Sequence, residues 1–179
     1  MPRFIVLLRG VNVGKGNRVA MAEFKPLLEG MGYTDVKTLL NSGNAVFSSS
    51  VRSGQKIAPA IAAQVESTFG VNTPVIVKSA AEWASIISGA PMNLPEAEHS
   101  RFLVAFGNDE EAVQTLAPLV PLAKPPERLY ITSQAAYLYC PAGLLESKVG
   151  KAVLGKAGRR VTTRNWGTVL KIEALLSTA

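Results

Sequence analysis

The residues best suited to chemistry in this chain form a glycine-rich loop, Gly10-Val11-Asn12-Val13-Gly14-Lys15-Gly16-Asn17-Arg18, which we call the glycine loop. Glycine lets the backbone approach a ligand closely or adopt a positive φ angle. Arginine, lysine and asparagine side chains donate the hydrogen bonds that anionic oxygens accept. The sequence therefore predicts an anion-binding loop whose ligand contacts are Arg9, Gly10, Asn12, Gly14, Lys15 and Arg18.

The spacing of the glycines argues against a nucleotide-hydrolysing phosphate loop. That motif has four residues between its first glycine and its Gly-Lys pair, and a serine or threonine follows the lysine. Here three residues separate Gly10 from Gly14, and Gly16 stands where the hydroxyl residue would bind Mg²⁺. Two interpretations remain, because glycine-rich turns can form concave anion sites and can also serve only as flexible connections.

A second polar segment, Asn41-Ser42-Gly43-Asn44, separates two short apolar runs. These residue types are typical of a tight hairpin turn for backbone reasons alone. Asn41, Ser42 and Asn44 are additional candidate ligand contacts. We expect the first two strands to run in opposite directions, which would place this turn and the glycine loop at opposite ends of their sheet.

A third polar segment, Thr162-Thr163-Arg164-Asn165-Trp166, precedes an apolar helical pattern. Thr163 or Asn165 is a suitable helix N-cap, and the N-terminus of a helix attracts anions. Arg164 and Asn165 are therefore predicted ligand contacts. Trp166 either stacks on a bound base or, as is more usual for an early helical tryptophan, packs in the core.

Residue types that many catalytic sites require are scarce. The one histidine, His99, lies in a loop rich in proline and glutamate, and Glu96 and Glu98 beside it form only a weak cluster of candidate metal ligands. The one cysteine, Cys140, has the context of a strand end. We expect no metal and no cofactor, and the sequence assigns no catalytic residue. An enzyme here would rely on Arg, Lys, Asn, Ser, Thr and Tyr.

Composition and charge limit the class of protein. The chain has 179 residues, of which 47% are hydrophobic and 18% are charged, as in a folded globular protein. The early apolar run Phe4–Leu8 is too short for a membrane helix, so we expect a cytoplasmic protein that does not enter membranes. The net charge of +6 is concentrated at both ends, around an acidic middle. This asymmetry favours an anionic partner, although a solvated surface explains it equally well.

Hydrophobic periodicity predicts the elements that position these residues. Strand, helix, strand, strand, helix and strand follow one another through residues 4–78, which is the ferredoxin-like order. The same order recurs after residue 79, although no sequence repeat is evident. We therefore expect an α+β fold of two ferredoxin-like βαββαβ halves packed as one compact unit. Residues 1–78 would form the first half, and residues 79–179 the second half with basic C-terminal helices.

Four segments resemble the DUF1697 family of bacterial proteins, whose function is unknown: Leu8–Gly14, Asn17–Met21, Asn41–Phe47 and Thr163–Val169. The resemblance runs through nearly the whole chain and implies an α+β fold with ferredoxin-like elements. It supplies no catalytic residues. Gly16 and Asn17 in the loop depart from the family pattern, as does Gly167, where asparagine is usual after the tryptophan.

Three functional hypotheses follow. The protein binds nucleic acid or another polyanion through its basic segments, or it binds or converts a small metabolite that carries phosphate or carboxylate, or it self-associates through its opposite charges. Recognition of bases on the sheet face is disfavoured, since Phe4 and Phe47 are better interpreted as core residues and the RNA-binding sequence pattern is absent. The sequence predicts no oligomeric state.

Overall fold

The computed structural model of this chain describes residues 1–178 and divides them into two compact units. The first unit contains Met1–Trp83 together with the residues from Ile172 onward, and the second contains Ala84–Lys171. Each unit holds one four-stranded antiparallel sheet. The prediction of two βαββαβ halves is confirmed.

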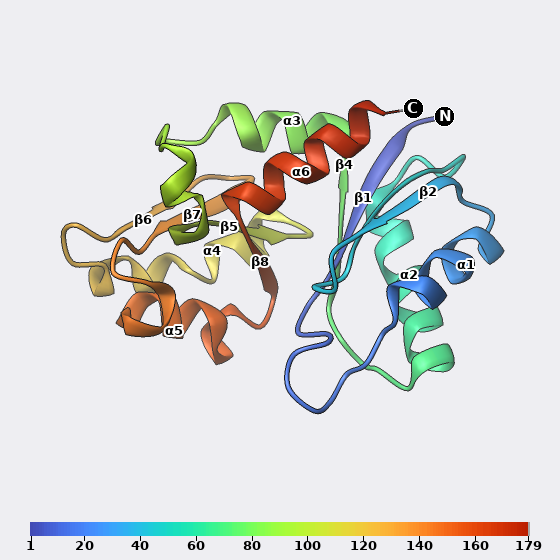
Figure 1. The fold of residues 1–179 in the computed structure, drawn as a ribbon, viewed down its shortest axis with the longest axis horizontal. Coiled ribbons are helices and arrows are strands. Elements are labelled where there is room, and N and C mark those ends of the chain that lie inside the picture. The colour runs from blue at the N-terminus through green and yellow to red at the C-terminus, as the bar shows by residue number, and fades with distance from the viewer. Residues whose placement is uncertain (179) are drawn as a thin grey trace. The chain divides into compact units, whose positions relative to one another are not determined.

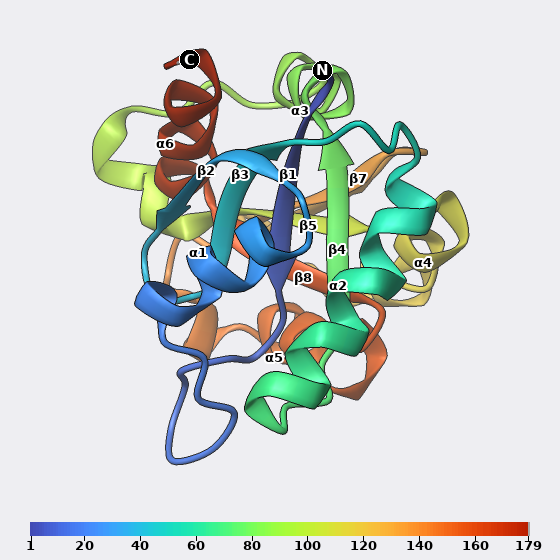
Figure 2. The same cartoon turned by 90° about the vertical axis from the view of Figure 1, so that its right-hand side faces the viewer.

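The first unit has the strand order β2-β3-β1-β4, and every neighbouring pair of strands is antiparallel. Two helices, α1 and α2, lie side by side on one face of this sheet (Figure 1 and Figure 2). Its elements are β1 (Arg3–Leu8), α1 (Met21–Gly30), β2 (Thr34–Leu39), β3 (Asn44–Ser48), α2 (Gly54–Phe69) and β4 (Val75–Ser79).

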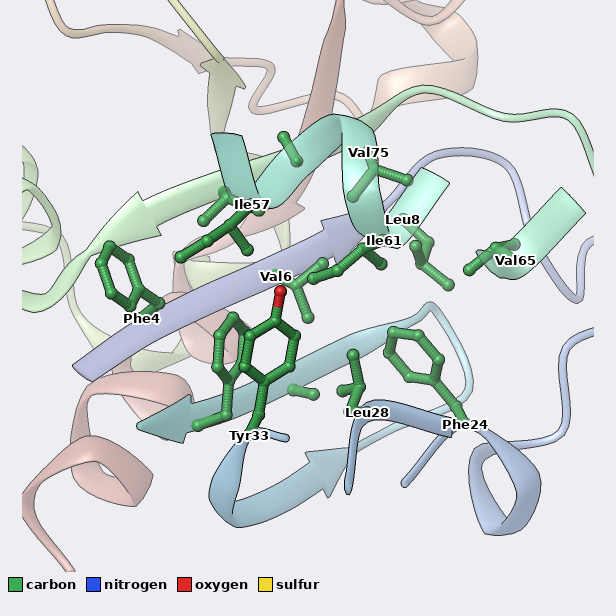
Figure 3. Packing of buried hydrophobic residues seen from close by; sticks show 14 of the residues in the cluster. Phe4, Val6, Leu8, Phe24, Leu28, Tyr33, Ile57, Ile61, Val65 and Val75 are labelled. Atoms are coloured by element: carbon green, nitrogen blue, oxygen red, sulfur yellow. The ribbon is translucent and has the colours of Figure 1, made fainter. Parts of the chain in front are cut away.

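The core of the first unit lies between the sheet and its two helices. Alternate residues of β1 point toward the helices, and α2 contributes apolar residues four positions apart, which share one helical face. The buried side chains shown in Figure 3 include Phe4, Val6, Leu8, Phe24, Leu28, Ile57, Ile61 and Val65. The rings of Phe4 and Phe47 stack with centroids 5.9 Å apart. These aromatic residues are therefore core residues, as predicted.

The ends of two helices follow from residues in the local sequence. Helix α2 ends at Gly70, whose φ of 67° is the left-handed conformation typical of a C-cap. Helix α3 (Ala80–Ser88) begins with a capping box, because the Ser79 N–H donates to a Glu82 carboxylate oxygen and the Glu82 N–H donates to Ser79 Oγ. Helix α1 begins at Met21 and continues through Pro26.

The second unit repeats the topology, with strand order β6-β7-β5-β8. Its apolar core is formed by the central strands β5 and β7 with residues of α4 and α5. Its regular elements are η1 (Glu96–Arg101), β5 (Phe102–Gly107), α4 (Glu110–Gln114), η2 (Ala117–Leu122), β6 (Arg128–Ile131), β7 (Ala135–Tyr139), η3 (Leu144–Glu146), α5 (Lys148–Leu154), η4 (Lys156–Gly158) and β8 (Val161–Asn165).

The last helix, α6 (Trp166–Ser177), begins in the second unit and ends in the first. In the first unit, Arg3 Nη1 donates to the carbonyl oxygen of Leu176 at 3.2 Å. Lys37 Nζ donates to the carbonyl oxygen of Thr178 at 2.6 Å. Cations at the C-terminus of a helix satisfy carbonyl groups that have no partner within the helix. Within residues 1–178, none of the helices combines the length and the apolar character that crossing a bilayer requires.

Candidate anion-binding site in the first unit

The glycine loop and the turn formed by residues 41–44 lie at the same end of the first sheet. Leu7 of β1 lies opposite Asn44 of β3, and the Leu8 N–H donates to the Gly43 carbonyl oxygen at 2.9 Å. The expectation that β1 and β2 run in opposite directions was therefore wrong. Both strands are antiparallel to β3, which lies between them, so they are parallel to each other. Helix α1 returns the chain to the end of the sheet where β1 begins, and β2 starts from that end.

The side chain of Asn12 joins the glycine loop to this turn. Its Nδ2 atom donates to the carbonyl oxygens of Val19, at 2.7 Å, and Asn41, at 2.8 Å. Its Oδ1 atom accepts a hydrogen bond from the Val19 N–H at 2.9 Å. With these three bonds Asn12 closes the base of the loop. Because its amide group already has these partners, Asn12 is a structural residue and not an available donor for a ligand.

Positive φ angles recur through the glycine loop, at 64° for Gly10, 58° for Asn12, 68° for Gly14 and 55° for Asn17. Glycine adopts this conformation without steric cost, and asparagine is the next most tolerant residue. In this part of the loop, alternate residues from 10 to 14 turn the backbone in the left-handed sense. Such alternation is the kind of backbone pattern that produces anion-binding concavities.

The tip of the loop is open to solvent and carries positive charge. Lys15, Gly16 and Arg18 are exposed. Arg18 Nη2 donates to the Gly14 carbonyl oxygen, which folds this side chain over the loop. A Cβ atom added at Gly10, Gly14 or Gly16 would meet no atom within 4 Å. Neither Lys15 nor Arg18 forms an ion pair with another described residue, so both cations are available to a bound anion.

The segment before β4 reaches the same end of the sheet. The Arg9 N–H donates to the Pro74 carbonyl oxygen at 3.2 Å, and Thr73 Oγ1 donates to the Arg9 carbonyl oxygen. Arg9 itself is half-buried. Thr73 and Pro74 were not among the residues predicted from the sequence, although the ferredoxin-like strand order places the start of β4 beside the end of β1.

The polar residues of the turn have mainly structural partners. Asn44 is fully buried, and its Nδ2 atom donates to the Leu39 carbonyl oxygen at 2.8 Å and to Ser42 Oγ at 2.9 Å. Asn41 is exposed and contributes its carbonyl oxygen to Asn12. Leu40 has a φ of 59° and leaves 47% of its surface exposed. A left-handed conformation is uncommon for such a residue, and no sequence signal predicted it.

The third predicted segment lies in the second unit. Arg164 is buried in β8, and its Nη1 atom donates to Thr162 Oγ1 and to the Thr163 carbonyl oxygen, both at 2.8 Å. Burial lowers the pKa of its guanidinium to about 10, which leaves the group charged at neutral pH. Asn165 Oδ1 accepts from the Thr168 N–H at 2.9 Å, as an N-cap does. The ring centroids of Trp166 and Phe102 are 5.2 Å apart, in agreement with a packing role for Trp166.

Other reactive groups do not add to this site. Cys140 is buried, and burial raises the pKa of its thiol, which keeps the thiol protonated. The part of the chain that the structure describes contains no group of three His, Cys, Asp or Glu residues placed to hold a metal ion. The groups that the first unit's site offers to a ligand are therefore ammonium, guanidinium and backbone N–H groups around an open loop.

Comparison with known proteins places the chain in a family. A family model described as a protein of unknown function, DUF1697, matches residues 1–137. The chain belongs to the DUF1697 family. Within this DUF1697 protein, the glycine loop and the 41–44 turn lie inside the matched residues, whereas the segment from Thr162 to Trp166 lies beyond them.

A solved structure is similar over the whole length of the DUF1697 protein. It is that of the conserved bacterial protein SP0830 from Streptococcus pneumoniae, which is 26% identical in sequence, with a TM-score of 0.73. The similarity covers 98% of this chain and 99% of that chain. No curated protein matches the sequence.

Proposed function

We propose that this DUF1697 protein binds the phosphate groups of nucleic acid through the tip of the glycine loop. The observation that carries the proposal is the exposed sequence Gly14-Lys15-Gly16, in which an unpaired ammonium group lies between two glycines that face open space. Gly16 has neither a positive φ nor a close neighbour. The fold does not require a glycine there, whereas close approach of a ligand to the backbone would.

The second unit supplies additional positive charge for the same class of ligand. The exposed cations here are Lys148 and Lys151 of α5, Lys156 of η4, and Arg159, which follows η4. Arg160 is excluded from this set, because its guanidinium pairs with Asp109 at 3.5 Å and with Glu111 at 3.2 Å. Lysine and arginine contacts to phosphate release counterions and are independent of base sequence. We therefore infer binding that is weakly sequence-specific and strongly salt-dependent.

Fluorescence anisotropy of labelled single-stranded RNA and duplex DNA, at two salt concentrations, tests the proposal. We expect binding that weakens steeply as salt rises. Lys15→Ala is compared with Lys25→Ala, which removes the same charge from an exposed position on α1. Gly16→Ala is compared with Gly30→Ala, because a Cβ meets no neighbour at either position. Absence of binding at low salt, or equal losses in each variant and its control, contradicts the proposal.

The alternation of positive φ angles from Gly10 to Gly14 supports a second candidate function, the binding of one phosphate or carboxylate group of a metabolite. A backbone concavity accommodates a single anion rather than a chain of them. Thermal denaturation with inorganic phosphate distinguishes the two functions. A melting temperature that rises with phosphate in the wild type but not in Lys15→Ala, without binding to nucleic acid, would favour the metabolite.

A further inference from the structure

We propose that the second unit has a separate small-molecule site, in the hollow between η1 and the first turns of α6. Its ligand is a metabolite that carries an anionic group together with an ammonium or hydroxyl donor. The hollow has a volume of about 510 Å³, which is within the range of metabolite pockets. It is lined by Glu96, His99, Asn165, Gly167, Leu170 and Lys171.

The imidazole of His99 is oriented by a backbone contact. Its Nε2 atom lies 3.1 Å from the carbonyl oxygen of Leu94. A carbonyl oxygen can only accept a hydrogen bond, so Nε2 carries the proton and, in the neutral ring, Nδ1 is an acceptor. No other described residue is hydrogen-bonded to Nδ1. His99 lines the hollow, and its ring carries an acceptor suited to a hydroxyl or ammonium group of a ligand.

The two charged residues of the hollow complement such a ligand. Lys171 and Glu96 are exposed, and neither forms an ion pair with another described residue. The ammonium group of Lys171 can bind an anionic oxygen, and the carboxylate of Glu96 can accept from a cationic or hydroxyl donor. Leu170 adds an apolar surface between these polar groups. Opposite charges in one hollow favour a zwitterionic ligand over a simple anion.

Gly167 keeps this hollow open. An added Cβ would lie 3.5 Å from Asn165 Oδ1 and 3.9 Å from His99 Cβ, which are ordinary contact distances, and the φ of Gly167 is not in the left-handed region. Neither packing nor backbone conformation therefore requires glycine at this position. A longer side chain would extend toward His99 and occupy space that a ligand would use.

His99 is the only histidine in the chain, so its imidazole Hε1 proton gives one assignable NMR signal, which the test follows. The probe is O-phosphoserine, and inorganic phosphate and ethanolamine supply the anionic and the ammonium group separately. We expect a saturable shift of the His99 signal with O-phosphoserine at millimolar concentrations, and weaker responses to the two fragments. No shift with any of the three probes overturns the proposal.

Variants of the hollow make the assignment specific. We expect Gly167→Leu to abolish the response and Gly167→Ala to retain most of it, while both fold, since alanine and leucine are better helix formers than glycine. Lys171→Met lowers the affinity about tenfold, as loss of a charge-assisted hydrogen bond predicts. Lys124→Met, at another exposed lysine of the second unit, leaves the affinity unchanged. Equal responses in Gly167→Leu and the wild type would overturn the proposal, as would equal affinities in Lys171→Met and Lys124→Met.

The same experiment separates this site from the glycine loop. In Lys15→Ala, we expect the His99 response to O-phosphoserine to persist at full amplitude. A response that disappears in Lys15→Ala would show that the shift arises from the first unit's site and would overturn the claim of a separate one.

Discussion

Asn12 Nδ2 donates a hydrogen bond to the carbonyl oxygen of Asn41, 2.8 Å away, and so connects two loops that are 29 residues apart in the chain. The same side chain also bonds both backbone polar groups of Val19. One asparagine therefore fixes the base of the glycine loop and leaves its tip free. This division of roles, with a rigid base and an open charged tip, is the geometry on which the proposed phosphate site depends.

Two replacements of Asn12 distinguish the contribution of its hydrogen bonds to stability from that of its backbone conformation. We expect Asn12→Gly to lower the free energy of unfolding by about 2 kcal/mol, because three hydrogen bonds are lost while the positive φ remains accessible. Asn12→Ala loses the same bonds and adds backbone strain of about 1 kcal/mol. Urea denaturation measures both variants. Equal stabilities of Asn12→Gly and the wild type would show that the bonds do not hold the loop.

Gly43 is the position in the turn where a side chain has no room. A Cβ there would lie 2.8 Å from Leu8 Cβ and 2.9 Å from Val11 Cγ2, and φ is 90°. We expect Gly43→Ala to cost about 3 kcal/mol, from overpacking together with strain. Gly70→Ala, at a φ of 67° with open space around the Cβ, is the control and costs about 1 kcal/mol. Thermal or urea unfolding compares them, and similar losses would contradict the steric argument.

The contribution of Lys15 to nucleic-acid binding has a distinct salt signature. Removal of one phosphate contact lowers the slope of log affinity against log salt by about 1. We therefore expect Lys15→Ala to reduce this slope and Lys25→Ala to leave it unchanged. Anisotropy titrations over a range of salt concentrations give both slopes. An unchanged slope in Lys15→Ala would remove Lys15 from the contact surface.

Tyr137 links the stability of the second unit to alkaline pH. Its hydroxyl donates to the Ile86 carbonyl oxygen at 2.6 Å, and burial raises its pKa from 10.0 to about 12. Between these values the unfolded chain loses the phenolic proton before the folded chain does, so the free energy of unfolding falls as pH rises. We expect Tyr137→Phe to be less stable at neutral pH but to lose less stability between pH 10 and pH 12. Urea denaturation across this range measures the difference.

The periodicity of apolar residues was sufficient to predict both βαββαβ halves, because each strand and helix has its own local pattern. The helix ends at Ser79 and Gly70 are local in the same way, since caps depend on residues a few positions apart. The relative direction of β1 and β2 was not inferred correctly. It follows from the insertion of β3 between them, which is a property of the sheet rather than of either strand.

The candidate site was predicted in part. The residue types of the glycine loop indicated exposed cations and left-handed turns, and the structure has both at Gly14 and Lys15. The structural role of Asn12 was missed, because its partners are backbone groups that the sequence does not distinguish. The left-handed conformation of Leu40 could not be predicted either, since leucine in a turn gives no signal for a positive φ.

The return of the chain's last described residues to the first unit has a consequence for biosynthesis. Arg3 and Lys37 leave the ribosome early, whereas their partners Leu176 and Thr178 are translated after the whole of the second unit. The first unit therefore stays incomplete while 88 intervening residues, Ala84–Lys171, are synthesised. A nascent chain stalled before residue 172 would therefore have the complete first sheet but would lack the partners of Arg3 and Lys37, and would expose both side chains to chaperones and proteases.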